Sequence, residues 1–213
     1  MGRAKDTSDL HGVVLVVDDD PSVRAAICDL LESVPLKVQA LASAEALLDR
    51  SFPDAPCCLV LDVRMPGMNG LELQRHLHDN GVAVPIVFIT AHGDVPMSVS
   101  AMKSGAIEFL TKPFRDQDLI DAVVAGLERD RMRRADAMRD ADLLERYALL
   151  SDREKEILRQ VVTGALNKQI AGELRISEIT VKVRRGSLMR KLHARSITDL
   201  VRFADRLAVL GIE

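Results

Sequence analysis

Residues 58–70 read CLVLDVRMPGMNG, an apolar run that ends at Asp62 and leads into a loop rich in Pro and Gly. Open α/β sheets keep their functional groups at the carboxyl ends of buried strands, which is where this carboxylate falls. Three other apolar runs also end in polar side chains: residues 13–17 before Asp18 and Asp19, residues 86–89 before Thr90, and residues 107–111 before Lys112. If the four runs are parallel neighbours, their polar ends meet at one edge. That edge suits a divalent cation and a transferable phosphoryl group.

The first 126 residues alternate between short apolar runs and amphipathic stretches. The runs are rich in Val, Ile and Leu and lie near residues 13–17, 36–41, 57–61, 85–89 and 107–110. Amphipathic stretches such as residues 23–31 and 71–77 separate them. Five strands that alternate with helices predict an α/β doubly wound, five-stranded parallel sheet.

The distribution of charge divides the chain further. Residues 1–126 carry a net charge of −8, residues 127–149 are balanced and residues 150–213 carry +5, although the whole chain carries only −3. We therefore predict an acidic first domain to residue 126, a charged helical linker over 127–147 and a basic domain over 148–213, with different partners. The linker lacks Pro and Gly, so we expect it to continue the preceding helix, with a coiled-coil seam as the alternative.

Composition argues against several classes of protein. No apolar stretch approaches the roughly 20 residues that span a bilayer, and the first residues lack a signal peptide, so we expect a cytoplasmic protein without a membrane partner. The adjacent Cys57 and Cys58 begin a strand and are expected to be small buried residues rather than a redox or metal pair. His76 and His78 are two apart on a predicted helix, where they face different directions and do not form a metal pair.

The predicted acidic edge has the groups that phosphoryl chemistry needs. Mg²⁺ prefers carboxylate and carbonyl oxygens and bridges to phosphate, and Asp18, Asp19 and Asp62 supply carboxylates that repel one another without a cation. An aspartate can attack phosphorus and form an acyl phosphate. The metal and Lys112 would neutralise the transferring oxygens, and Thr90 can offer its hydroxyl to the new phosphate.

With these residues in place, residues 12–126 resemble a CheY-like receiver domain of two-component signalling over all five strands. The resemblance is carried by the order Asp-Asp, Asp, Thr and Lys-Pro on successive strand ends. It implies that Asp62 is the phosphoacceptor and that Asp19, Asp62 and the backbone carbonyl of Arg64 bind Mg²⁺, with Asp18 acting mainly through water. It also implies roles for Thr90 as the switch hydroxyl, Phe109 as the switch aromatic that rotates inward, and Lys112 as the phosphate-binding lysine before a cis Pro113.

The last part of the chain reads as four short helices. Ser151 and Glu154 are expected to form a capping box at the start of the first helix, and Gly164 to end it. The other three helices are expected over residues 167–174, 178–192 and 198–210. A tight turn at residues 175–177 predicts a helix-turn-helix, in which the third of these helices enters the major groove of DNA. On that helix the core face holds Val181, Leu188 and Leu192, whereas Ile179, Lys182, Val183, Gly186 and Arg190 point away from it.

Phosphate contacts give affinity, and contacts to base edges give sequence choice. The predicted DNA contacts combine both kinds of residue: Lys168, Thr180, Lys182, Val183, Arg184, Arg185, Arg190 and Lys191. Residues 148–210 resemble the LuxR-type DNA-binding domain through LSDREKEIL at 150–158, Gly164, NKQIA at 167–171 and ISEITVKV at 176–183. Arg184 departs from that pattern, in which a histidine is usual.

The whole chain thus resembles a two-component response regulator of the NarL/FixJ family, closest to the FixJ branch. The resemblance implies that a sensor histidine kinase phosphorylates Asp62 and that Thr90 and Phe109 then reorganise a face built from residues 94–126. That face would form a homodimer, which binds two-fold promoter DNA and acts with RNA polymerase. The protein would be no enzyme beyond its part in its own stoichiometric phosphorylation.

Two alternatives remain at this point. A phosphatase of the haloacid-dehalogenase type also uses a strand-end aspartate with Mg²⁺, and residues 18–22 read Asp-Asp-Asp-Pro-Ser, but such an enzyme would give Asp62 and the basic domain no role. The other alternative is a phosphate-independent DNA-binding regulator that uses its receiver only for dimerisation.

Overall fold

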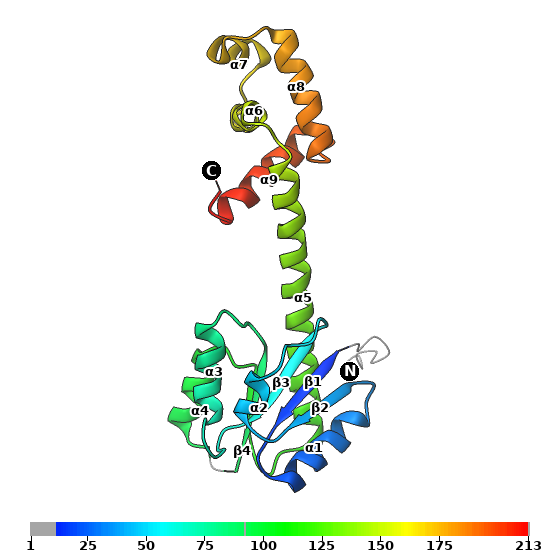
Figure 1. Cartoon of the computed structure of the whole chain (residues 1–213), viewed down its shortest axis with the longest axis vertical. Coiled ribbons are helices and arrows are strands. Elements are labelled where there is room, and N and C mark those ends of the chain that lie inside the picture. The colour runs from blue at the N-terminus through cyan, green and yellow to red at the C-terminus, as the bar shows by residue number, and fades with distance from the viewer. Residues whose placement is uncertain (1–11, 92, 213) are drawn as a thin grey trace, which may run out of the picture. The chain divides into compact units, whose positions relative to one another are not determined.

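Five strands form one parallel sheet in the computed structural model, which describes residues 12–91 and 93–212 (Figure 1). The order across the sheet is β2-β1-β3-β4-β5, so the topological switch point lies between β1 and β3. The strands are β1 (Val13–Val17), β2 (Lys37–Leu41), β3 (Cys57–Asp62), β4 (Ile86–Thr90) and β5 (Glu108–Thr111). They coincide with the five apolar runs, which confirms the predicted doubly wound sheet.

Helices cover both faces of the sheet. One face packs against α1 (Pro21–Glu32) and the first part of α5 (Asp116–Ala148). The other packs against α2 (Ala44–Leu48), α3 (Gly70–Asp79) and α4 (Val95–Lys103). Because both faces are covered, β1, β3 and β4 are buried along their whole length, and their polar residues lie only at or just beyond their carboxyl ends.

Local signals start the helices next to the sheet edge. Asp20 caps α1 by accepting hydrogen bonds from the backbone N–H groups of Ser22 and Val23, directly before Pro21. At the start of α3, a Cβ on Gly70 would lie only 2.4 Å from the backbone oxygen of Asp62. Glycine at this position therefore lets α3 begin directly beside the end of β3.

Helix α5 is continuous over 33 residues, so the charged segment does continue the preceding helix. Two compact units divide within it, one up to Ala135 and the other from Asp136. In the first unit the buried carboxylate of Asp130 accepts a hydrogen bond from the backbone N–H of Cys57 at 2.9 Å. The same carboxylate pairs with the guanidinium groups of Arg133 and Arg134, which fixes this part of α5 against the start of β3.

The second unit holds four helices after α5, as predicted. They are α6 (Asp152–Val162), α7 (Asn167–Leu174), α8 (Glu178–Lys191) and α9 (Ile197–Val209). Its core includes Ile157, Ile170, Val181, Leu188 and Leu200. The turn between α7 and α8 starts at Arg175, whose left-handed φ of 54° ends α7 abruptly. Within the described residues, no helix has the length and apolar character that crossing a membrane would need.

Candidate phosphoacceptor and DNA-binding sites

The carboxyl ends of four strands bring the predicted polar groups to one edge. Asp62 and Thr90 end β3 and β4, and Asp18 and Lys112 directly follow β1 and β5. The Nζ atom of Lys112 lies 2.8 Å from Oδ2 of Asp18 and 2.9 Å from Oδ1 of Asp62. Asp18 is 1% exposed and Asp62 is 5% exposed. Two buried carboxylates therefore share one ammonium group.

Backbone groups fix the remaining carboxylate oxygens. Oδ2 of Asp62 accepts a hydrogen bond from the backbone N–H of Arg64 at 2.7 Å, and Oδ1 of Asp18 accepts one from that of Asp20 at 2.9 Å. Arg24 of α1 donates a hydrogen bond to the backbone oxygen of Asp18 at 2.6 Å. Arg24 is not among the site residues predicted from the sequence, since no spacing rule connects a helix residue to the carbonyl of a strand end.

The electrostatics of the edge follow from burial and pairing. Burial raises the pKa of Asp62 above its ordinary value, and the hydrogen bond from Lys112 opposes that change. Burial disfavours the charged form of Lys112, but its hydrogen bonds to Asp18 and Asp62 outweigh this and raise its pKa. Lys112 therefore stays charged at neutral pH. One ammonium between two carboxylates leaves negative charge that can attract a further cation.

The donor chemistry of the edge fits magnesium. Mg²⁺ takes a few oxygen ligands, keeps several waters and needs only one or two carboxylates. Asp62 and the backbone carbonyl of Arg64 lie on the same strand end and loop, and the exposed Asp19 adjoins Asp18. Within the described ranges, no three His, Cys, Asp or Glu side chains already form a group that could hold a metal. Lys112 instead bridges Asp18 and Asp62, so metal binding would have to recruit Asp19 and water.

Thr90 and Phe109 lie beside this edge. Thr90 is fully buried, and its backbone oxygen accepts a hydrogen bond from the backbone N–H of Lys112 at 2.8 Å. The half-buried ring of Phe109 lies 6.1 Å from that of Phe88. A Cβ on Gly93 would lie 2.7 Å from Cε1 of Phe109 and 3.1 Å from the methyl of Thr90. Gly93 is not among the site residues predicted from the sequence, although a glycine just after a strand end is a signal of close approach.

In the second unit, α8 has the predicted division of faces. Val181, Leu188 and Leu192 are buried in the core. Ile179 is 76% exposed and Val183 is 66% exposed. Lys182 and Arg190 are exposed as well, as is Lys168 on α7. An exposed face that mixes aliphatic and cationic side chains can contact thymine methyl groups and phosphates together.

Other predicted DNA contacts already have partners in the protein. Arg185 donates a hydrogen bond to Oδ1 of Asn167 at 2.6 Å, and the hydroxyl of Thr180 lies 2.8 Å from that of Ser177. The ammonium of Lys191 lies 2.6 Å from Oε2 of Glu154. Arg184 is half-buried beside these groups and lines the same shallow pocket as Thr180 and Lys191.

Glu154 connects α6 to α8. The predicted capping box is present, with Ser151 and Glu154 each bonded to the other's backbone N–H. Glu154 also accepts hydrogen bonds from Lys191 and from the hydroxyl of Ser187 at 2.8 Å. Burial opposes ionisation, but these bonds outweigh it and lower the pKa of Glu154 to about 2. The sequence identified the cap but not this link, because Lys191 is distant in sequence.

Comparison with known proteins agrees with this geometry. The family described as "Response regulator receiver domain" matches residues 14–124, and the one described as "Bacterial regulatory proteins, luxR family" matches residues 148–204. Nodulation protein W of Bradyrhizobium diazoefficiens is 50% identical over 92% of this chain and 87% of its own length. The transcriptional regulatory protein FixJ of Azorhizobium caulinodans is 46% identical over 90% of both chains.

A solved structure of the response regulator StyR is similar with a TM-score of 0.85, is 47% identical, and is matched over 92% of this chain and 98% of its own. Its match covers both the sheet and the helical unit. The chain therefore belongs to the FixJ-like response regulators, a family of phosphorylation-activated transcription regulators that join a receiver domain to a LuxR-type DNA-binding domain.

Proposed function

We propose that Asp62 accepts a phosphoryl group from a sensor histidine kinase. An oxygen of its carboxylate forms the new O–P bond while the P–N bond of the donor phosphohistidine breaks, and the imidazole nitrogen of the kinase keeps the electron pair. The observation that supports this assignment is the buried Asp62 carboxylate paired with Lys112 at the carboxyl edge of the sheet. Each oxygen of Asp62 accepts one hydrogen bond, from Lys112 at Oδ1 and from the Arg64 N–H at Oδ2, and so keeps a further lone pair for the attack on phosphorus.

The residues around Asp62 bind the metal ion and the transferred phosphoryl group. Asp19, Asp62 and the backbone carbonyl of Arg64 would hold Mg²⁺, with Asp18 acting through water, and the ion would supply positive charge to offset that on the transferring oxygens. Lys112 keeps its contact with Asp18 and turns its ammonium to a phosphoryl oxygen. Its raised pKa supports this role, because the group then carries its charge at every physiological pH.

The switch lies next to the site. Thr90 offers its hydroxyl to the phosphoryl group, and Phe109 moves with it, because both side chains lie against Gly93, where a Cβ would be only 2.7 Å from Phe109. The face built from residues 94–126 then forms the homodimer. A ligand can shift such an equilibrium only by its differential affinity for the two states, so the phosphoryl group must bind Thr90 and Lys112 better in the active arrangement.

The second unit reads promoter DNA as a dimer and acts with RNA polymerase in the cytoplasm. Lys182, Val183 and Arg190 face the major groove, and Lys168 binds phosphate. Thr180, Arg185 and Lys191 contribute less to DNA binding, because each already has a partner within the protein. The half-buried Arg184 makes an intermediate contribution. We assign residues 1–126 to the receiver, 127–147 to the linker and 148–213 to the DNA-binding domain.

Intact-mass spectrometry after incubation with acetyl phosphate and Mg²⁺ tests the assignment. The wild type should gain one phosphoryl group per chain, and Asp62→Asn should gain none. Asp54→Asn, which changes an exposed aspartate of the same unit, should behave as wild type. Equal labelling of Asp62→Asn would disprove the assignment, and repeated turnover of a phosphoester would indicate a phosphatase instead.

A further inference from the structure

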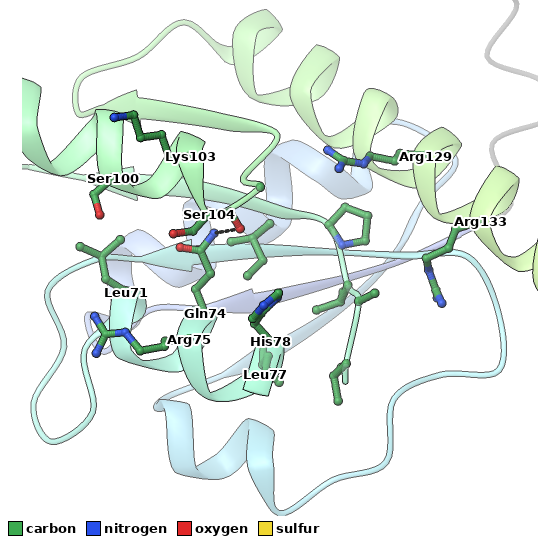
Figure 2. Close-up of a pocket in the computed structure, with 16 residues that line it drawn as sticks. Leu71, Gln74, Arg75, Leu77, His78, Ser100, Lys103, Ser104, Arg129 and Arg133 are labelled. Atoms are coloured by element: carbon green, nitrogen blue, oxygen red, sulfur yellow. Dashed lines mark hydrogen bonds between the residues drawn. The ribbon is translucent and has the colours of Figure 1, made fainter. Parts of the chain in front are cut away.

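A cavity of about 790 Å³ opens in the first unit between α3, α4, α5 and the segment that leads into β4 (Figure 2). The cavity is lined by Ile86 at the start of β4. Asp62, on the neighbouring strand β3, lies level with Ile89 near the end of β4. The cavity is therefore at the opposite edge of the sheet from the phosphoacceptor. Its size lies in the range of roughly 300–1,000 Å³ that is usual for small-molecule sites.

The lining of this cavity is apolar with a cationic rim. Leu77, Val84 and Pro85 are among the apolar residues. The charged and titratable groups around them are all basic or imidazole: Arg75, His78, Lys103, Arg129 and Arg133. No carboxylate belongs to the lining that the structure describes. Such a cluster is unexpected in a unit whose residues 1–135 carry a net charge of −6.

The cations gather at two ends of the cavity. Figure 2 shows Arg129 and Arg133 of α5 at one end and Lys103 of α4 with Arg75 of α3 at the other, with His78 between them. Arg75, Lys103 and Arg129 form no ion pair with any residue in the described ranges. These charges are therefore available to a ligand.

The helix dipole accounts for only part of this cluster. Cations are favoured in the last turn of a helix, where Lys103 and His78 lie. Arg129 and Arg133 lie far from either end of α5, and Arg75 precedes the last turn of α3. Their presence around one apolar hollow needs another explanation.

The walls of the cavity are held in place before any ligand binds. The side-chain amide of Gln74 on α3 donates hydrogen bonds to the backbone oxygens of Ala101 and Ser104, at 3.3 Å and 3.2 Å, and so joins α3 to α4. On α5, Nε and one terminal nitrogen of Arg133 bind Asp130, which orients the guanidinium. Groups that are already ordered lose less entropy when a ligand binds.

We propose that this cavity binds a small amphipathic dianion, with an apolar body against Leu77, Val84 and Pro85 and an anionic group at each end. One anionic group pairs with Arg129 and Arg133, and the other with Arg75 and Lys103. The site is distinct from the phosphoryl-transfer site, because none of the residues assigned to phosphoryl transfer lines the cavity. A dianion there would link α5 to α3 and α4.

Isothermal titration calorimetry on the full chain tests the proposal with three probes of one shape. They are 2,6-naphthalenedicarboxylate, 2-naphthoate and the neutral 2,6-naphthalenedimethanol. The dicarboxylate should bind at least tenfold more tightly than the monocarboxylate, and the diol should bind least. Equal affinities for the three, or no binding of the dicarboxylate at millimolar concentration, would overturn the proposal.

Variants locate the site. Arg129→Gln and Arg75→Gln each remove an exposed guanidinium without breaking an ion pair, and each should weaken the dicarboxylate at least tenfold while leaving 2-naphthoate within about threefold. Ala83→Trp, at an exposed position of the lining, should abolish binding by filling the hollow. Arg115→Gln, which changes an exposed arginine outside the cavity, should leave binding unchanged. A loss in Arg115→Gln equal to that in Arg129→Gln would contradict a specific site.

Discussion

Lys112 and Asp62 form an ion pair across the carboxyl edge of the sheet, with Nζ of Lys112 2.9 Å from Oδ1 of Asp62. The same ammonium lies 2.8 Å from Asp18, so its removal would leave two buried carboxylates without a countercharge. The side chain of Lys112 is itself 21% exposed, which moderates the effect through solvent. This relationship makes the stability of the first unit depend on a cation at the edge.

Lys112→Met should lower the free energy of unfolding of the first unit by about 2 kcal/mol, below the roughly 3–5 kcal/mol for a fully buried pair. Mg²⁺ should then restore more stability to the variant than it adds to the wild type, because it no longer competes with the ammonium. Hydrogen exchange of residues 57–62, followed by mass spectrometry with and without Mg²⁺, measures both effects. Lys37→Met, at an exposed position, is the control. An identical response to Mg²⁺ in Lys112→Met and wild type would argue against a cation site here.

Asp130→Asn should loosen helix α5 where it leaves the sheet. The amide keeps the shape of the carboxylate but leaves Arg133 and Arg134 without their buried countercharge, at a cost of about 2–4 kcal/mol. Hydrogen exchange in residues 127–135 should become faster, as should that of the Cys57 N–H. Asp136→Asn removes only an exposed pair with Arg139 and should change stability by less than about 0.5 kcal/mol. Equal effects of the two variants would show that Asp130 does not anchor α5.

Glu154 should make the stability of the second unit depend on acid. Its folded pKa is lowered to about 2 from an ordinary value of 4.5, so it contributes stability above the unfolded pKa that is lost as pH falls from about 4.5 towards 2. Glu154→Gln should lower the free energy of unfolding by about 1–3 kcal/mol at pH 7 and much less at pH 2. Tyr147, the single tyrosine of a chain without Trp, packs on this core and supplies the fluorescence signal for urea unfolding.

The matched control for Glu154 is Glu156→Gln, whose carboxylate forms only a surface pair with Arg153. It should shift the urea midpoint little at either pH. A loss of stability in Glu154→Gln that is the same at pH 7 and pH 2 would contradict the role of its ionised form.

Lys182 and Lys191 should differ in how they support DNA binding. Lys182 is exposed, so Lys182→Gln should reduce the slope of log K against log salt by about one on a nonspecific duplex. Lys191 is paired with Glu154, so Lys191→Gln should change that slope less and instead destabilise the second unit. Fluorescence anisotropy at several salt concentrations measures the slopes. A larger change of slope for Lys191→Gln would reverse this division.

The sequence predicted the sheet because its inner strands β1, β3 and β4 are buried on both faces and so appear as continuous apolar runs. It also predicted that Asp18, Asp62, Thr90 and Lys112 meet, since parallel strands bring their carboxyl ends to one edge. It did not predict that Lys112 bridges Asp18 and Asp62. Bridging depends on side-chain length and burial, which strand order does not set.

The cavity between α3, α4 and α5 and the intramolecular partners of α8 could not be predicted from the sequence, for a different reason. Arg75, Lys103 and Arg129 come from three helices, and no periodic pattern joins them. Likewise, the sequence predicts Lys191 only as a DNA contact, whereas in the structure it pairs with Glu154. Contacts between distant segments follow from packing, whereas local signals give only the start, end and apolar face of each element.

Phosphorylation of Asp62 as the trigger of dimerisation is the central claim, and sedimentation velocity tests it most directly. Wild type and Asp62→Asn are compared with Mg²⁺, each with and without beryllofluoride, which imitates the phosphoryl group. The account predicts a shift from monomer to dimer in the wild type with beryllofluoride, and none in Asp62→Asn. The same sedimentation of both proteins under all conditions would contradict it and leave a DNA-binding regulator whose receiver does not respond to phosphate.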